Sequence, residues 1–324
     1  MITLRGLTKR YGDRTAVRDL TLEVPAGRVT GFLGPNGSGK STTMRMILGL
    51  DRPTAGVALV GGRPYGALRH PLREVGALLD AKAVHPGRSA RAHLVAMARS
   101  NGIAVRRVEE VLDTVGLTAV AGRRVGSFSL GMGQRLGIAG ALLGDPRVVM
   151  LDEPVNGLDP DGVLWVRGLM RSLAAEGRTV FVSSHLMSEM ELMADRLVVI
   201  GRGRLIADAP VAEVIAGSSR NAVRVRSPRA GDLAALLAAE GVEVVEVEGW
   251  DLVAVEVSLE RVGLLCHEHG IPLYELSARE ASLEEAYMEL TGASVEYGAA
   301  AGIPAAGAGA RAGVAAGLGA VAGR

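Results

Sequence analysis

The sequence contains very few cysteine, lysine and aromatic residues. Its 324 residues include one cysteine and three lysines, and Phe, Tyr and Trp make up 3% of the chain. A single thiol excludes a disulfide within the chain, which fits a reducing compartment. The formal net charge is +1, from 36 basic and 35 acidic residues, so the overall charge predicts no nucleic-acid partner.

Long apolar runs are also missing. Ala, Val and Leu are frequent, but charges interrupt them before any strongly apolar stretch reaches 18 residues. We therefore expect no membrane-spanning helix. Residues 1–5 show no apolar core of a secretory signal, so none is expected. Any role at a membrane is predicted to depend on a partner.

The most specific motif lies at residues 34–41, Gly-Pro-Asn-Gly-Ser-Gly-Lys-Ser, and matches the phosphate-binding pattern G-x-x-x-x-G-K-[ST]. The apolar run Val29–Leu33 precedes it, and Met44, Ile47 and Leu48 follow at helical spacing. Strand, glycine-rich loop and helix are the context in which this motif binds phosphate. An ordinary glycine-rich turn is the alternative, and it does not explain this context.

The chemistry of the loop follows from its residue types. Glycines let backbone N–H groups curl around phosphates, and the start of the next helix adds partial positive charge. Lys40 is expected to reach the β- and γ-phosphates, and the Ser41 hydroxyl to ligate Mg²⁺. The predicted nucleotide ligands are Gly34, Pro35, Asn36, Gly37, Ser38, Gly39, Lys40, Ser41 and Thr42.

Three continuous apolar runs predict buried parallel strands: Val148–Leu151, Thr179–Val182 and Leu197–Ile200. Between the first two, apolar residues recur at helical spacing from Val163 to Leu173. The alternation of strands and helices predicts an α/β layered core.

Asp152 and Glu153 follow the first of these strands directly. A carboxylate at the end of such a strand, beside a phosphate loop, is where nucleotide-bound Mg²⁺ is held. We therefore predict that Asp152 serves the metal and that Glu153 orients or deprotonates an attacking water. A plain acidic loop is the alternative.

Three further segments carry a family resemblance: Phe128–Arg135, Pro154–Asp159 and Ser183–His185. Together with the phosphate loop and the acidic pair, they resemble the ordered motifs of ABC-type ATP-binding proteins over about residues 1–216. The resemblance implies a P-loop NTPase fold. Such a fold has a RecA-like core, an antiparallel β subdomain and a helical subdomain, here at about residues 86–144.

The resemblance also implies roles for single residues. Tyr11 would stack on adenine, and His185 would contact the γ-phosphate. Ser129 and Gly131 would contact nucleotide held by a second subunit, because members of the family sandwich two ATP molecules between two such domains. Asp159 lies in the loop expected to cross that interface. For Tyr11 and His185 the alternatives are a surface aromatic and a structural histidine, and Ser129 could act as a helix N-cap.

Two positions depart from the family pattern. Met132 ends the segment that corresponds to the family's signature sequence, Phe128–Met132, and stands where that sequence usually has glutamine. Asp80 occupies the expected position of another glutamine that touches the metal site. A carboxylate can ligate Mg²⁺, so Asp80 is a candidate metal ligand, with a solvated loop as the equal alternative. Both departures resemble the ATP-binding subunits of drug- and peptide-antibiotic-resistance exporters of the daunorubicin and bacitracin types.

The composition changes near residue 217. Residues 217–297 predict a small α+β accessory unit, in which Ser282 and Glu285 have the spacing of a capping box. Ala and Gly dominate residues 298–324. Such a tail buries too little apolar surface to offset the entropy of ordering, so disorder is expected.

The resemblance implies an ATP- and Mg²⁺-dependent ATPase that energises a separate ABC-2 type permease and exports a drug, an antibiotic or another amphipathic compound. It implies a homodimer of ATP-binding domains on the cytoplasmic face of the membrane. The alternatives are an ABC-type ATPase that acts on ribosomes or DNA and a non-catalytic regulator. The chain has one ATP-binding cassette and no C-x-x-C pair, which argues against an ATPase that acts on ribosomes or DNA. The presence of Glu153 and His185 argues against a non-catalytic regulator.

Overall fold

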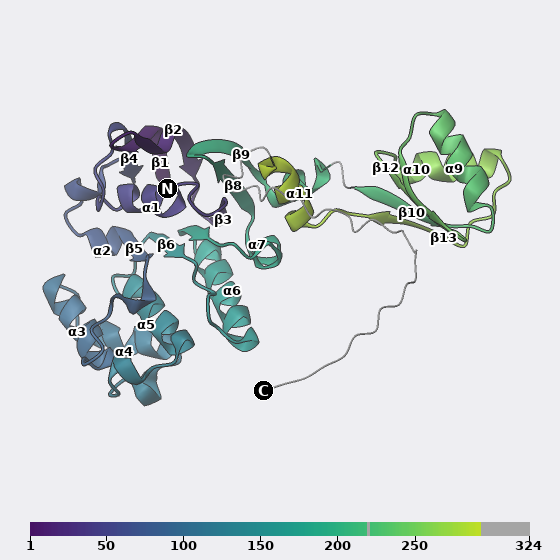
Figure 1. Cartoon of the computed structure of the whole chain (residues 1–324). Helices are drawn as coiled ribbons and strands as arrows, with labels where there is room; N and C mark the ends of the chain where they lie inside the picture. Colours follow the sequence, from purple (N-terminus) through teal and green to yellow (C-terminus); the bar gives the residue numbers. More distant parts are fainter. Residues whose placement is uncertain (219–220, 293–324) are drawn as a thin grey trace, which may run out of the picture.

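A computed structural model describes residues 1–218 and 221–292 (Figure 1). The expected disordered tail, residues 298–324, lies outside the described residues. The described chain contains a large α/β unit that holds the phosphate loop and a smaller α+β unit connected to it by extended strands.

The centre of the large unit is a six-stranded sheet with the order β5-β6-β7-β3-β8-β9. Every neighbouring pair is parallel except β8 and β9. The strands are β3 (Arg28–Leu33), β5 (Val75–Leu78), β6 (Val148–Asp152), β7 (Thr179–Ser183), β8 (Arg196–Gly201) and β9 (Arg204–Pro210). The α/β prediction is therefore confirmed, and the three continuous apolar runs are buried strands of this sheet.

Parallel pairing determines where the site forms. Strands β3, β6 and β7 run in the same direction, and their register aligns Asp152 with Ser183 and Ser183 with Phe32. The carboxyl ends of these strands therefore meet at one edge of the sheet. The phosphate loop leaves β3 at this edge, and α1 (Lys40–Ile47) begins directly after the loop.

An antiparallel sheet of order β2-β1-β4 covers the other side of α1. Its strands are β1 (Ile2–Tyr11), β2 (Arg14–Val24) and β4 (Ala55–Val60). Alternate residues of β1 and β2 join Met44 and Ile47 of α1 in one buried cluster with Phe32 and Phe181. This packing fixes the start of α1 relative to both sheets and confirms the predicted antiparallel β subdomain.

The helices of the large unit form its second core with the main sheet. They are α3 (Ala90–Ser100), α4 (Arg106–Thr114), α5 (Leu130–Leu142), α6 (Pro160–Ala175), α7 (Met187–Met193) and α8 (Val211–Ala216). The short helix α2 (Pro71–Glu74) precedes β5 and has no buried residue. Single 3₁₀ turns occur at Tyr65–Ala67, Ala81–Ala83, Thr118–Val120 and Val125–Ser127. Helix α5 lies very close to β5, because a Cβ on Gly76 would stand 1.9 Å from the Ala141 carbonyl oxygen.

The smaller unit has the order β-α-β-β-α-β, the split βαβ arrangement of ferredoxin-like folds. Its strands pair in the order β11-β12-β10-β13, all antiparallel, with α9 and α10 packed on the sheet. The elements are β10 (Ala222–Arg226), α9 (Ala230–Ala239), β11 (Val244–Glu248), β12 (Asp251–Val255), α10 (Leu259–Glu268) and β13 (Glu275–Arg279). The predicted α+β unit is confirmed.

The last described helix, α11 (Leu283–Thr291), returns to the large unit. Leu283, Ala286 and Tyr287 are buried in the core of the main sheet and its helices. The Leu283 N–H donates to a carboxylate oxygen of Glu191 in α7 at 3.0 Å. The predicted capping box at the start of α11 is present. The sequence placed this helix within the accessory unit, whereas the structure packs it against α7 and α8.

Among residues 1–218 and 221–292, no helix has the length and apolar character needed to cross a membrane.

The packing of α11 makes a stability prediction. Leu283→Ala removes a fully buried side chain from the core of the large unit and should lower the free energy of unfolding by about 2–5 kcal/mol. Met288→Ala, in the same helix but 61% exposed, is the control and should change stability little. Thermal unfolding of the large unit, followed by calorimetry, measures both. Equal effects of the two substitutions would contradict the packing of α11.

Candidate functional site

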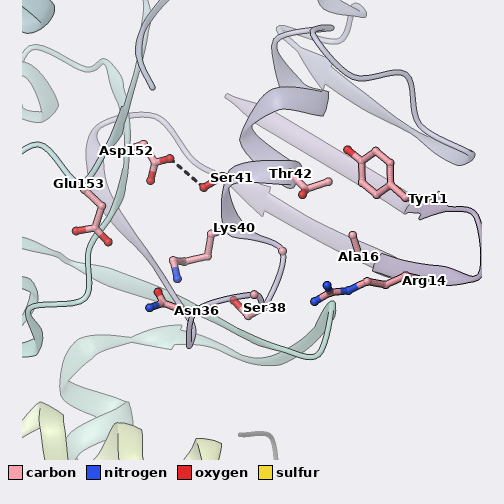
Figure 2. A pocket seen from close by; sticks show the side chains of 12 residues that line it. Tyr11, Arg14, Ala16, Asn36, Ser38, Lys40, Ser41, Thr42, Asp152 and Glu153 are labelled. Atoms are coloured by element: carbon pink, nitrogen blue, oxygen red, sulfur yellow. Dashed lines mark hydrogen bonds between the residues drawn. The ribbon is translucent and has the colours of Figure 1, made fainter. Parts of the chain in front are cut away.

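A cavity of about 570 Å³ lies between the antiparallel sheet and the carboxyl edge of the main sheet (Figure 2). It combines the phosphate loop, the acidic pair after β6 and the hairpin that joins β1 to β2. The lining residues are Tyr11, Arg14, Ala16, Asn36, Gly37, Ser38, Gly39, Lys40, Ser41, Thr42, Asp152 and Glu153. Of the residues predicted from the sequence, the cavity thus collects Tyr11, most of the loop and both carboxylates.

The loop needs glycine at two crowded positions. A Cβ on Gly34 would stand 2.4 Å from the Ser38 hydroxyl oxygen. Gly39 has a φ of 106° and lies so close to β2 that a Cβ would stand 2.6 Å from the Ala16 carbonyl oxygen. Gly39 is also the residue before α1, where no side chain caps the helix. The start of α1 therefore faces the cavity with its partial positive charge.

Lys40 lies folded against its own loop. Its Nζ donates to the carbonyl oxygens of Gly34 at 2.5 Å and Pro35 at 3.3 Å. Burial lowers the pKa of Lys40, while the nearby carboxylates of Glu153 and Asp152 raise it. A half-buried ammonium whose hydrogen bonds go to neutral carbonyl oxygens gains from an anionic acceptor, and a phosphate supplies one.

Hydroxyl groups hold Asp152 from two sides. Ser41 Oγ donates to Asp152 Oδ2 at 3.1 Å, and Ser183 Oγ donates to Asp152 Oδ1. A carboxylate beside a hydroxyl, close to a phosphate loop, is a hard oxygen donor set of the kind that Mg²⁺ prefers. The residues therefore fit the expected metal, which Ser41 and Asp152 would hold.

Glu153 is held in a strained backbone conformation with a φ of 50°. Its N–H donates to both the carbonyl oxygen and the hydroxyl oxygen of Ser183, at 3.2 and 3.1 Å. Its carbonyl oxygen accepts from the side-chain amide of Gln134 at 2.8 Å. These bonds fix the backbone on both sides of the residue. Strain kept in place by surrounding hydrogen bonds is typical of functional residues.

The Glu153 carboxylate contacts His185, which follows β7. The distance between Glu153 Oε2 and His185 Nδ1 is 2.8 Å. The His185 side chain is 56% exposed, so a ligand or a second chain can reach its other ring nitrogen. The structure thus brings together the two residues that the sequence predicted as catalytic.

Tyr11 lies at the far end of the cavity from the carboxylates (Figure 2). It is 49% exposed, and its hydroxyl donates to Asp51 at 3.1 Å. Lys9 Nζ lies 4.8 Å from the centroid of the ring. An exposed aromatic ring at the mouth of a phosphate site provides a surface on which a base can stack.

Ser129 and Gly131 do not line the cavity of their own chain. Ser129 caps α5 by accepting the Met132 N–H at 3.2 Å, as its alternative role predicted. The start of α5 packs against the loop before α6, since a Cβ on Gly131 would stand 3.2 Å from a methyl group of Leu158.

Two other predicted positions lie outside the cavity lining. Asp80 is exposed two residues after β5, the strand beside β6. Asp159 caps α6 by accepting the Gly162 N–H at 2.9 Å. The role of Asp80 as a metal ligand and that of Asp159 at a dimer interface stay predictions.

Sequence reasoning missed four residues of the site. Ser183 and Gln134 hold the acidic pair, and Arg14 and Ala16 line the cavity. Ser183 had a signal, because it ends a buried strand that pairs with β6. Gln134, Arg14 and Ala16 belong to the site only because folding brings them next to it, and the sequence alone does not show that proximity.

Comparison with known proteins agrees with this geometry. A family model described as ABC transporter matches residues 17–156, and one described as a domain of unknown function (DUF8746) matches residues 221–284. The chain is 36% identical to the bacitracin transport ATP-binding protein BcrA of Bacillus licheniformis, over 90% of this chain and 97% of the relative. It is 35% identical to the Nod factor export ATP-binding protein I of Burkholderia orbicola, over 91% and 98%.

The fold also resembles a solved dimeric structure of a bacterial ABC transporter cassette, MJ0796. The TM-score is 0.60 at 24% identity, over 65% of this chain and 98% of the cassette. At this identity the likeness concerns the fold alone. The BcrA and Nod factor relatives, by contrast, match the chain over nine-tenths of its length.

The contacts of Ser183 predict a metal effect. Ser183→Ala removes the hydroxyl that donates to Asp152 and accepts from Glu153, so hydrolysis should need a higher Mg²⁺ concentration and run about tenfold slower. Ser184→Ala, an equally buried neighbour whose hydroxyl accepts the Leu186 N–H, is the matched control. Titration of ATPase activity with Mg²⁺ measures the effect. If both variants showed the wild-type Mg²⁺ dependence, Ser183 would have no part in the site.

Proposed function

The chain belongs to the ABC transporter family and is an ATPase of that family, and from this we propose that it energises a separate export permease in the membrane. The observation that carries the proposal is the cavity itself. Its lining joins the phosphate loop to Asp152 and Glu153, Glu153 contacts His185, and Ser129 and Gly131 lie outside the lining, which supports a site completed by another copy.

The proposed binding mode follows the long axis of the cavity. The adenine base stacks on Tyr11, and the phosphates lie along the loop toward Asp152. Lys40 exchanges its carbonyl acceptors for phosphate oxygens. Mg²⁺ held by Ser41 and Asp152 would neutralise charge on the phosphates. Asp80 is proposed as a further metal ligand, because β5 ends at the same edge of the sheet as β6.

Glu153 is proposed as the base that accepts a proton from the attacking water. A positioned general base contributes about 10²- to 10⁴-fold to a rate. Ser183 and Gln134 position Glu153, because they hydrogen-bond to its backbone N–H and to its carbonyl oxygen. His185 holds the carboxylate at 2.8 Å, and we propose that it exchanges this contact for the γ-phosphate when ATP is bound.

The site is proposed to be complete only in a dimer. Ser129 and Gly131 lie at the start of α5, next to the loop between β6 and α6, and are not among the residues that line the cavity of their own chain. In a head-to-tail pair of chains, the start of α5 from one copy covers the γ-phosphate bound by the other. The capping role of Ser129 is compatible with this, because both roles use the same helix start.

Export of a drug, an antibiotic or another amphipathic compound is proposed from the relatives, whose names state bacitracin transport and Nod factor export. The partner is proposed to be a permease of the ABC-2 type. We propose that this permease holds the chain at the cytoplasmic face of the membrane, since the names of the relatives state transport and export.

Glu153→Gln tests the proposed base. The variant should bind ATP with nearly wild-type affinity, hydrolyse it about 10²-fold more slowly or worse, and accumulate as an ATP-bound dimer. Nucleotide titration, phosphate release and size-exclusion chromatography with ATP measure these properties. Normal turnover by this variant would show that the base assignment is wrong.

Purification from native membranes tests the transport role. In mild detergent, the tagged full chain should copurify with a polytopic membrane protein, and an amphipathic peptide antibiotic should stimulate the ATPase activity of the complex. The Lys40→Ala chain serves as the control, since it should copurify but show no stimulation. Recovery with ribosomes or DNA and without a membrane protein would favour the alternative ATPase class.

A further inference from the structure

Arg14 is the one cationic side chain besides Lys40 that lines the nucleotide cavity in the described part of the chain. It begins β2, directly opposite Tyr11 in the antiparallel register. The two-residue turn between them, in which Gly12 has a φ of 55°, places both side chains at the same end of the hairpin. The strand pair that presents the aromatic ring therefore also presents a guanidinium.

The side chains of Arg14 and Tyr11 point toward different parts of the cavity, which indicates different roles. Figure 2 shows the guanidinium extending toward the phosphate loop near Ser38, whereas the Tyr11 ring lies beside Thr42. Ala16, whose carbonyl oxygen limits the room at Gly39, follows two residues after Arg14. The strand thus packs against the loop at a point that brings Arg14 to it from the side opposite Asp152.

The negative charge in the cavity favours a second cationic group such as the Arg14 guanidinium. Asp152 and Glu153 bring two negative charges, and a nucleoside triphosphate adds several more at neutral pH. Without Arg14, Lys40 would be the only cationic side chain in the lining to offset them. A guanidinium suits this place, because its planar set of donors can bind two phosphate oxygens at once.

We propose that Arg14 is a phosphate ligand of the bound nucleotide, acting from the side of the loop opposite the metal. The inference rests on the proposed nucleotide site and adds a residue to it. Tyr11 then stacks on the base, and Arg14 and Lys40 bind the phosphates from two sides. Ser41 and Asp152 ligate the metal. The hairpin of β1 and β2 thus contacts both the base and the phosphates of the nucleotide.

Nucleotide titrations of the full chain without Mg²⁺ test the proposal. Arg14→Gln should raise the Kd for ATP and for ADP about tenfold or more, and should leave weak adenosine binding, followed by ligand-observed NMR, unchanged. Arg14→Lys should fall between Arg14→Gln and wild type, because it keeps the charge and loses the planar fork.

Arg18→Gln is the matched control. Arg18 lies in the same strand, is exposed and carries the same charge, but does not line the cavity, so its ATP affinity should equal that of wild type. Wild-type ATP affinity in Arg14→Gln, or an equal loss of adenosine binding, would overturn the proposal. Lys40→Ala distinguishes a failure of the proposed Arg14 role from a failure of the proposed nucleotide site. If it loses ATP while Arg14→Gln does not, only the role of Arg14 fails, and if it binds ATP normally, the proposed nucleotide site fails.

Discussion

The pairing of β6 with β7 is the constraint on which the site depends. It aligns Asp152 with Ser183, so one buried hydroxyl can hold the Asp152 carboxylate through its proton and the Glu153 backbone through its oxygen. On the other side of Asp152, Ser41 connects the same carboxylate to the start of α1. The phosphate loop, Asp152 and the Glu153 backbone thus become one hydrogen-bonded unit whose geometry is set by strand register.

The same sheet edge connects chemistry to the rest of the molecule. His185 contacts Glu153, and two residues later α7 begins. Helix α7 is joined to α6 by the half-buried ion pair of Arg167 with Glu189 at 2.8 Å, and to α11 by Glu191. The Glu153–His185 contact therefore lies next to a helix that contacts both α6 and the C-terminal helix α11.

Much of the site was predictable because its residues are close in sequence. The phosphate loop, Asp152 and Glu153 follow apolar strands directly, and both the strands and their α/β layering follow from continuous apolar runs. Gln134 and Arg14 were not predictable, because their roles arise from contacts across long stretches of chain. The return of α11 was missed for a related reason. Its apolar face indicates that it packs against something, but the partner, α7 and α8, is known only once the sheet is assembled.

On the proposed function, each site is shared between two copies, with Lys40 from one and Ser129 from the other. Mixing two inactive variants tests whether this is so. Lys40→Ala and Ser129→Arg each spoil both sites of a homodimer, whereas a heterodimer of the two keeps one site with an intact loop and an intact signature. The ATPase activity of the mixture should rise clearly above the sum of the separate chains. If the mixture shows only that sum, while each chain still folds, the site is not built across two copies.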